Sequence, residues 1–352
     1  MKVIVDDKIP FIRGQVERLA DEVVYLPGAA IGPADVHDAD ALIVRTRTLC
    51  DRRLLEGSRV RFVATATIGY DHLDTQYLDE AGIQWTNCPG CNATSVAQYV
   101  RNSLFEAERE GLVRLSEAVL GIIGFGHVGT AVFEAMRPYV RRIIVNDPPL
   151  FGNEERRMKK EGFANALEQA PNGKSLHEIA VSCDIITLHV PLTSDGPWPT
   201  RHLVDEAFIQ SLKRRPLMIN AARGGVVDER ALEHALDEGL VRQAIIDTWE
   251  DEPAICRTLL RKAFIATPHI AGYSADGKAN ATRMSLEALA KWMEQDSPTP
   301  NKEQKPTFDI QPPHAEPERT GLNYSPMEDS RRLKDNPAGF EQQRGQYPLR
   351  RE

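Results

Sequence analysis

The sequence predicts an α/β protein with two doubly wound parallel sheets, each in a domain of its own. Short apolar runs rich in β-branched residues alternate with segments long enough to cross over a parallel sheet. One of these runs leads directly into a Gly-x-Gly-x-x-Gly pattern at Gly124, Gly126 and Gly129. The chain has 352 residues, 41% of them hydrophobic, which is enough for two or three domains.

Charge and composition argue against several classes of protein. The net charge of -8, from 51 acidic and 43 basic side chains, disfavours nucleic acid or an anionic membrane surface as a partner. Residues 1–7 are too polar for a signal peptide, and no apolar run approaches the roughly 18 residues that span a bilayer. We therefore expect a cytoplasmic protein whose five cysteines are reduced thiols.

The first domain is predicted from the alternation of elements over residues 1–93. The expected elements are a helix over 12–19 and strands over 3–5, 23–26, 41–44, 62–64 and 83–86. Residues 95–114 have helical spacing without proline and are expected to bridge into the second domain. A helix over 274–293 would return to the first domain and make it discontinuous, 1–93 plus 273–294.

The second domain is predicted over residues 94–272. Its expected strands are 118–123, which runs into the glycine pattern and a helix ending at 136, and then 143–146, 185–189, 217–221, 244–247 and 264–267. Residues 295–306 have the composition of a linker. Residues 307–352 contain too few aliphatic side chains for a core of their own. They are therefore either disordered or packed on another surface, including that of a second subunit.

Cys88 and Cys91 have the Cys-x-x-Cys spacing of a redox pair or of half a zinc site. The Pro-Gly between them is ordinary turn chemistry. Neither a second Cys-x-x-Cys nor paired histidines complete a tetrahedral site in the sequence. We expect a turn here and no metal.

The surroundings of the glycine pattern indicate a dinucleotide site. A strand precedes it, a helix follows it, and Asp147 lies about 20 residues on, near the end of the next predicted strand. Gly124 permits the tight turn, Gly126 lets the backbone approach the pyrophosphate, and Gly129 allows close packing of helix on strand. Asp147 would accept hydrogen bonds from the ribose hydroxyls and repel a 2′-phosphate, which favours NAD over NADP. The alternative is that Asp147 is only a turn residue before two prolines.

One of the nine histidines is the candidate for proton transfer. His269 stands in a polar loop just after a predicted strand, where open α/β sheets bind their ligands, and is best placed for general acid/base chemistry. His189 is the main competitor because it ends another apolar strand, but we expect it to shape the cofactor cleft. His127, next to Val128 inside the glycine loop, would present its backbone to phosphate.

Arg223 is the candidate that would bind an anion. It follows a predicted strand at the start of a glycine turn, where a guanidinium can bind a carboxylate through two hydrogen bonds. A surface salt bridge is the alternative. Four carboxylates lie within residues 247–252, and composition alone does not choose among them. An arginine, a carboxylate and His269 would together suit hydride transfer from an anionic hydroxy acid.

At these residues the chain resembles the D-isomer-specific 2-hydroxyacid dehydrogenases, which pair a Rossmann-like NAD-binding domain with a discontinuous substrate-binding domain. The resemblance covers roughly residues 1–293 and includes the strongly patterned segments 220–228 and 268–273. It implies that Arg223, Glu252 and His269 are catalytic. In this way it selects Glu252 among its acidic neighbours.

Within the family, the similarity is greatest to the branch that oxidises 4-phospho-D-erythronate in pyridoxal 5'-phosphate (vitamin B6) biosynthesis. It is carried by the segments 1–10, 63–67, 89–93 and 269–273. The contacts that it implies are Thr46, Thr67 and Tyr273 for the substrate, and Asp147, Val190, Asp247 and Gly272 for the cofactor, with Ala221 and Ala222 beside the nicotinamide. It also implies a homodimer formed through the short C-terminal dimerisation region, residues 307–352.

The resemblance implies oxidation at C2 to (R)-3-hydroxy-2-oxo-4-phosphooxybutanoate. Hydride passes to the nicotinamide, His269 removes the hydroxyl proton, Glu252 orients His269, and Arg223 binds the carboxylate. Two alternatives remain open at this point. One is a dehydrogenase for another 2-hydroxy acid, such as 3-phosphoglycerate or D-lactate, and the other is an NAD-sensing binding module.

The substrate phosphate requires further positive charge. Arg45 and Arg47 are the first candidates because they flank Thr46. A weaker hypothesis is that Arg350 or Arg351 reaches the phosphate across a dimer.

Overall fold

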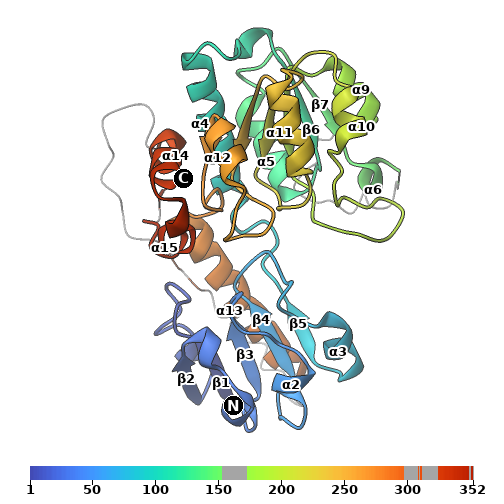
Figure 1. Cartoon of the computed structure of the whole chain (residues 1–352). Helices are drawn as coiled ribbons and strands as arrows, with labels where there is room; N and C mark the ends of the chain where they lie inside the picture. The colour runs from blue at the N-terminus through green and yellow to red at the C-terminus, as the bar shows by residue number, and fades with distance from the viewer. Residues whose placement is uncertain (153–172, 297–307, 309, 311–323, 349, 352) are drawn as a thin grey trace. The chain divides into compact units, whose positions relative to one another are not determined.

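The computed structural model describes residues 1–152, 173–296, 308, 310, 324–348, 350 and 351. They form two compact units. Among the described residues, unit 1 contains 1–92, 274–296, 308, 310 and 351, and unit 2 contains 93–152, 173–273, 324–348 and 350. Each unit contains one parallel sheet with helices, which confirms the predicted fold class (Figure 1). Of the expected linker, all but its first two residues lie outside the described part of the chain.

The sheet of unit 1 has five parallel strands in the order β2-β1-β3-β4-β5. The strands are β1 (Lys2–Asp6), β2 (Glu22–Leu26), β3 (Ala41–Val44), β4 (Phe62–Thr65) and β5 (Gln84–Thr86). The helices are α1 (Pro33–Val36), α2 (Arg52–Leu55), α3 (Thr75–Glu80) and α13 (Ala275–Asp296), with 3-10 turns η1 (Val16–Arg18) and η2 (Gly28–Ala30).

Alternation of side chains along these strands divides the core of unit 1 between two faces. Val3 and Val5 of β1 join one buried cluster with apolar residues of α13. Ile4 joins the other cluster with residues of α1, α2 and α3. The segment that follows residue 273 is therefore part of this fold.

The prediction of a helix over 12–19 is wrong. Only the short turn η1 forms there, because Gly14 adopts a φ of 79°, in the left-handed region that an α-helix cannot include. The apolar spacing instead serves a loop whose residues Ile12 and Val16 are buried against the sheet.

The sheet of unit 2 has six parallel strands in the order β11-β10-β9-β8-β6-β7. The strands are β6 (Val119–Ile123), β7 (Arg142–Asn146), β8 (Ile185–Leu188), β9 (Leu217–Asn220), β10 (Gln243–Ile246) and β11 (Ile265–Ala266). The helices up to residue 262 are α4 (Ala93–Arg109), α5 (His127–Met136), α6 (Pro148–Phe151), α9 (Leu176–Ser182), α10 (Glu206–Gln210), α11 (Glu229–Asp237) and α12 (Arg257–Lys262), with a 3-10 turn η3 (Leu115–Glu117).

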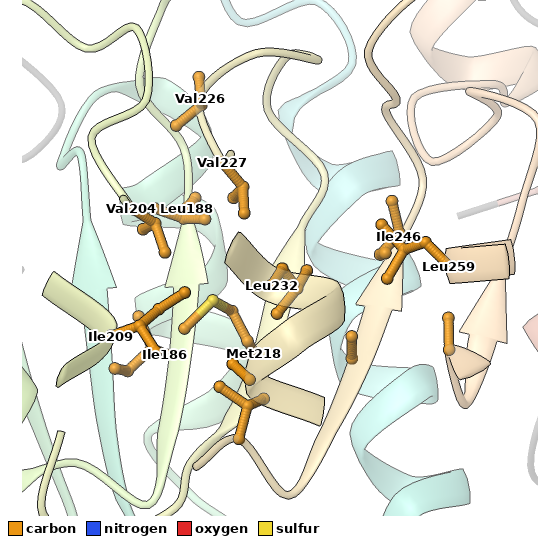
Figure 2. Packing of buried hydrophobic residues seen from close by; sticks show 14 of the residues in the cluster. Ile186, Leu188, Val204, Ile209, Met218, Val226, Val227, Leu232, Ile246 and Leu259 are labelled. Atoms are coloured by element: carbon orange, nitrogen blue, oxygen red, sulfur yellow. The ribbon is translucent and has the colours of Figure 1, made fainter. Parts of the chain in front are cut away.

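Helices cover both faces of this sheet. Residues of α4 and α5 pack with one face. Figure 2 shows part of the other face, where Ile186 and Met218 on neighbouring strands lie near Ile209 of α10 and Leu232 of α11. The strands are apolar on both sides, as expected for a parallel sheet buried between two layers.

In both sheets the strand order reverses beside the first strand, because the chain adds strands first on one side of it and then on the other. In unit 1 this occurs between β1 and β3, and in unit 2 between β6 and β8. Ligands of open α/β sheets bind at the carboxyl ends of the strands near such a switch point. The glycine pattern follows β6 directly and therefore lies at the switch point of unit 2.

Of the described residues of the C-terminal region, 324–348 and 350 belong to unit 2. They contain α14 (Pro326–Asp335), η4 (Pro337–Gly339) and α15 (Phe340–Gly345). The Ala266 amide of the edge strand β11 donates to Ser330 Oγ at 2.9 Å, and Leu333 is fully buried in the core. A helix thus covers an edge strand that would otherwise expose unpaired backbone groups. None of the described helices combines the length and apolarity needed to cross a membrane.

Candidate active site

The three predicted catalytic residues follow three neighbouring strands of unit 2. Arg223 lies in the loop after β9, Glu252 in the loop after β10 and His269 in the loop after β11. Parallel strands place their following loops at the same edge of the sheet. The first two loops pack closely, since a Cβ added at Gly224 would come within 1.8 Å of the Trp249 carbonyl oxygen.

His269 and Glu252 form a hydrogen-bonded pair. His269 Nδ1 lies 2.9 Å from Glu252 Oε2 and 3.1 Å from Oε1, and the two side chains are 27% and 17% exposed. A carboxylate at Nδ1 favours the tautomer with its proton there, which leaves Nε2 as the proton acceptor. The pair is therefore accessible to a small substrate and arranged for general base chemistry.

The Glu252 carboxylate is held in its ionised form. Burial would raise its pKa, but the hydrogen bond and the charge of His269 outweigh burial and lower the pKa overall. The Trp249 amide donates to Glu252 Oε1 at 2.9 Å, and Arg344 Nη1 lies 3.7 Å from Oε2. A permanent negative charge beside His269 stabilises the imidazolium that forms when it takes a proton.

Asp247 organises the loop that carries His269. Its buried carboxylate accepts from Thr267 Oγ1 at 2.6 Å and from the amides of Ile270 and Ala271 at 2.8 and 2.9 Å. Its carbonyl oxygen accepts from the His269 amide at 2.8 Å. Burial raises the pKa of Asp247, a shift that the charge of His269 and these hydrogen bonds oppose. Gly272 lies in the same loop.

Arg223 is half-buried in the loop after β9. Its Nη1 donates to the Ala222 carbonyl at 2.8 Å, and Asn220 Nδ2 donates to the Arg223 carbonyl at 3.1 Å. Within the described residues it forms no ion pair, so a surface salt bridge does not account for it there. Ala221 and Ala222, which precede Arg223, are buried.

The glycine loop after β6 fits a dinucleotide. A Cβ at Gly129 would meet the Gly124 carbonyl oxygen at 2.0 Å, and one at Gly124 would meet the His189 backbone at 2.6 Å and Val190 at 2.9 Å. A Cβ at Gly126 would meet nothing within 4 Å, and no side chain caps α5 there. The start of α5, with the backbone of His127 and Val128, thus leaves room beside Gly126 where a pyrophosphate can bind.

Asp147 connects the glycine loop to α6. Its Oδ2 accepts from the Phe125 amide at 2.8 Å, and its Oδ1 accepts from the Leu150 amide at 3.0 Å as the N-cap of α6. Each carboxylate oxygen can accept a further hydrogen bond, so these contacts are compatible with a ribose hydroxyl. Both expectations for this residue, ribose ligand and turn residue, therefore fit its position.

His189 has the environment of a neutral side chain. Its Nε2 lies 2.9 Å from Thr187 Oγ1, and no carboxylate is hydrogen-bonded to it in the described structure. Burial lowers the pKa of His189 to about 3. It would therefore be a poor proton acceptor near neutral pH.

The candidate substrate residues of unit 1 follow β3 and β4, again at the carboxyl ends of strands. Arg45 Nη1 donates to the Lys8 carbonyl at 3.0 Å, and Thr46 is exposed beside it. The Thr67 hydroxyl lies 2.8 Å from Thr65 Oγ1 and donates to the Gly69 carbonyl at 2.8 Å. These contacts fix Thr67 more firmly than Thr46.

Cys88 and Cys91 are both buried free thiols. The Cys88 thiol lies against the Thr65 and Ala281 carbonyls at 3.4 and 3.2 Å, and burial raises its pKa to about 11. A thiol with such a pKa is a poor nucleophile and metal ligand. No cluster of potential metal ligands is found among the residues that the structure describes.

Comparison with known proteins identifies the family. Residues 92–271 match the model of the D-isomer specific 2-hydroxyacid dehydrogenase NAD binding domain. The chain belongs to the D-isomer-specific 2-hydroxyacid dehydrogenases. Among curated members of this family, the erythronate-4-phosphate dehydrogenase of Bacteroides fragilis (strain ATCC 25285) is 49% identical over 100% of this chain and 97% of its own length.

Two solved structures show the same fold. A glyoxylate reductase from Paecilomyes thermophila matches with a TM-score of 0.69 and 22% identity, over 87% of this chain and 99% of that one. The NAD+-bound 3-phosphoglycerate dehydrogenase of Entamoeba histolytica matches with a TM-score of 0.68 and 24% identity, over 86% and 99%. The prediction of an NAD-dependent 2-hydroxyacid dehydrogenase is confirmed, as is NAD as the cofactor of this family's domain.

Some residues of the site carried no sequence signal. Arg344 lies near Glu252, and its Nε donates to the Tyr273 hydroxyl at 3.3 Å, although 71 positions separate the two residues. Glu229 accepts from the Glu250 amide at 2.7 Å. Neither residue belongs to a recognisable motif, and only the folded chain brings them to the site.

The raised pKa of Glu229 can be tested through the pH dependence of stability. Burial, followed by the charges of Glu250, Asp251 and Glu252, raises its pKa from 4.5 to about 7, despite the amide that favours its ionised form. A carboxyl whose pKa is higher in the folded state contributes stability below pH 4.5, and this is lost as the pH rises through 7.

We expect Glu229→Gln to reduce this loss, because glutamine cannot ionise and keeps the oxygen that accepts from Glu250. Between pH 5 and 8 the native protein should lose about 1 to 3 kcal/mol of unfolding free energy through this group. Urea unfolding across that range measures the difference. The control is Glu206→Gln, an exposed carboxylate at the same position of α10. Equal losses in native protein and Glu229→Gln would show that Glu229 ionises normally.

Proposed function

We propose that the protein oxidises 4-phospho-D-erythronate to (R)-3-hydroxy-2-oxo-4-phosphooxybutanoate with NAD, a step in pyridoxal 5'-phosphate biosynthesis. The hydrogen bond between His269 and Glu252 carries the chemistry, because it prepares a general base at the carboxyl edge of the sheet that holds the glycine loop. The substrate name is supported by the relative that is 49% identical over the whole chain.

The proposed roles follow from the environment of each side chain. His269 Nε2 takes the proton of the C2 hydroxyl, while Glu252 stabilises the imidazolium that results. Arg223 binds the substrate carboxylate and polarises the oxygen that becomes the carbonyl. NAD, when bound, accepts the hydride from C2.

We assign the cofactor to unit 2. Gly124, Gly126 and Gly129 would admit the pyrophosphate, with His127 and Val128 at the helix start and Asp147 at the ribose. The residues proposed to contact the rest of the cofactor are Val190, Ala221, Ala222, Asp247 and Gly272. The Asp247 carboxylate already accepts three hydrogen bonds. We propose that it holds in place the loop after β11, which contacts the cofactor.

We assign substrate binding to residues 1–93 plus 273–294, with Tyr273, Thr46 and Thr67 as hydrogen-bond partners. Arg45 would supply positive charge for the phosphate. Residues 94–272 would form the NAD-binding domain and 307–352 the region of a homodimer interface. The compartment that we propose is the cytoplasm.

His269→Ala is expected to reduce kcat by roughly 10² to 10⁴-fold, because it removes the general base. The measurement is NADH formation with 4-phospho-D-erythronate, 3-phosphoglycerate and D-lactate, using native protein and the variant. The proposal requires the first substrate to have the highest kcat/KM. A preference for another acid would assign the chain to a different reaction, and tight NAD binding without turnover of any acid would favour the NAD-sensing module.

Arg45→Gln is expected to raise KM for 4-phospho-D-erythronate by roughly 10-fold or more, since a charged hydrogen bond contributes about 1.5 to 3 kcal/mol. The KM for the unphosphorylated D-erythronate should change little. Steady-state kinetics with both acids, with Arg52→Gln as an exposed arginine control, measures the effect. An equal change for both acids would remove Arg45 from the phosphate site.

Light scattering coupled to size-exclusion chromatography is expected to give the mass of a dimer, twice 39.3 kDa. Removing residues 324–352 should convert the dimer to a smaller species. A native protein that stays monomeric across the concentrations at which it is active would exclude the homodimer.

A further inference from the structure

Arg350, in the C-terminal region, contacts the backbone of the loop that carries His269. Its side chain is 9% exposed, and its five N–H groups meet five acceptors, which use all of the donors of a guanidinium. The acceptors are Gln98 Oε1 at 2.9 Å, the Ile270 and Tyr273 carbonyls at 2.9 Å each, the Ser95 carbonyl at 3.0 Å and the Ala271 carbonyl.

These contacts correct the hypothesis that Arg350 binds the substrate phosphate across a dimer. A phosphate would have to displace these acceptors, which include the carbonyls of the buried residues Ser95 and Ile270. The Tyr324 ring, with its centroid 4.5 Å from Arg350 Cζ, covers the guanidinium further. Arg350 is therefore engaged within unit 2, and its charge serves the protein backbone.

The peptide group between Ile270 and Ala271 is held on both sides, because Arg350 donates to its carbonyl and Asp247 accepts from its amide. Asp247 accepts from the Ile270 and Ala271 amides, and Arg350 donates to the carbonyls of those two residues. A peptide group whose N–H and C=O are both hydrogen-bonded to buried side chains has little freedom to rotate. His269, directly before them, has a φ of 57°, a conformation that a non-glycine residue keeps only when its surroundings impose it.

The contacts in α4 give Arg350 a rigid base. Ser95 and Gln98 both belong to the 17-residue helix that packs against α5, so the guanidinium links the loop to a long helix of the core. The charge is desolvated in this position, and only its complete set of hydrogen bonds offsets that cost.

We propose that Arg350 is a positioning residue for His269, and that the C-terminal region completes the active site through it. Arg350 and Asp247 together fix the segment 269–273, and this places the His269 ring against Glu252. The inference rests on the proposed role of His269 in proton transfer. In this proposal Arg350 acts through the loop backbone and not through a contact of its own with the substrate.

The test compares Arg350→Gln and Arg350→Lys with Arg332→Gln as a matched control. Arg332 lies in the same C-terminal region, is 56% exposed and pairs with Glu328 in α14. Two measurements are made on the full chain: hydrogen exchange of the peptide covering 268–273, and kcat with 4-phospho-D-erythronate and NAD. A primary isotope effect with substrate deuterated at C2 reports whether hydride transfer becomes rate-limiting.

For Arg350→Gln we expect faster exchange in 268–273, a kcat lower by roughly 10²-fold, and a larger isotope effect, because a general base displaced by about 1 Å loses that much rate. Arg350→Lys should lie between native protein and Arg350→Gln, and Arg332→Gln should match native protein. In Arg350→Ala, added guanidinium ion should restore part of kcat by occupying the vacated site.

Unchanged exchange in 268–273 for Arg350→Gln overturns the proposal, whether or not kcat falls. The proposal is also overturned if 268–273 exchanges faster in Arg350→Gln while the kcat of this variant stays within twofold of that of native protein. Should Arg350→Gln fail to fold, Arg350→Lys decides by the same two measurements. If native protein does not oxidise 4-phospho-D-erythronate, the proposed function fails, while the exchange experiment still tests the contact between Arg350 and the loop.

Discussion

The buried carboxylate of Asp247 is the contact on which the rest of the candidate site depends. It stands at the end of β10 and accepts hydrogen bonds from the chain that follows β11, so two neighbouring strands are joined where they leave the sheet. An ionised group in this position would be costly without such donors, and here it receives a hydroxyl and two amides. The left-handed backbone of His269 and its contact with Glu252 both follow from this arrangement.

The site combines rigid backbone with few charged side chains. Glu252 is ionised and hydrogen-bonded, His269 keeps one nitrogen open to a substrate, and Arg223 stands in the adjacent loop. His189 illustrates the opposite case, since the same residue type without a carboxylate partner is kept neutral by burial. Placement relative to a charge, and not residue type, therefore separates the candidate base from the other histidine at a strand end.

The sequence predicted the strands of both sheets because parallel strands are apolar throughout and end at polar loops, as in 41–44 and 119–123. It also predicted the glycine loop, where the absence of room for a Cβ at Gly124 and Gly129 leaves only one residue type. The helix at 12–19 was wrong because apolar spacing does not reveal the backbone turn at Gly14. Arg350 could not be assigned from sequence, since its acceptors are mainly backbone carbonyls, which every residue has.

The proposed oxidation at C2 is tested by following the transferred hydrogen. Native protein is incubated with NAD and 4-phospho-D-erythronate carrying deuterium at C2, and the reduced nicotinamide is examined by NMR at its C4 position. We expect to find the deuterium there, because hydride leaves C2 as His269 takes the hydroxyl proton. Reduced nicotinamide without deuterium would contradict oxidation at C2 and, with it, the roles assigned to Arg223, Glu252 and His269.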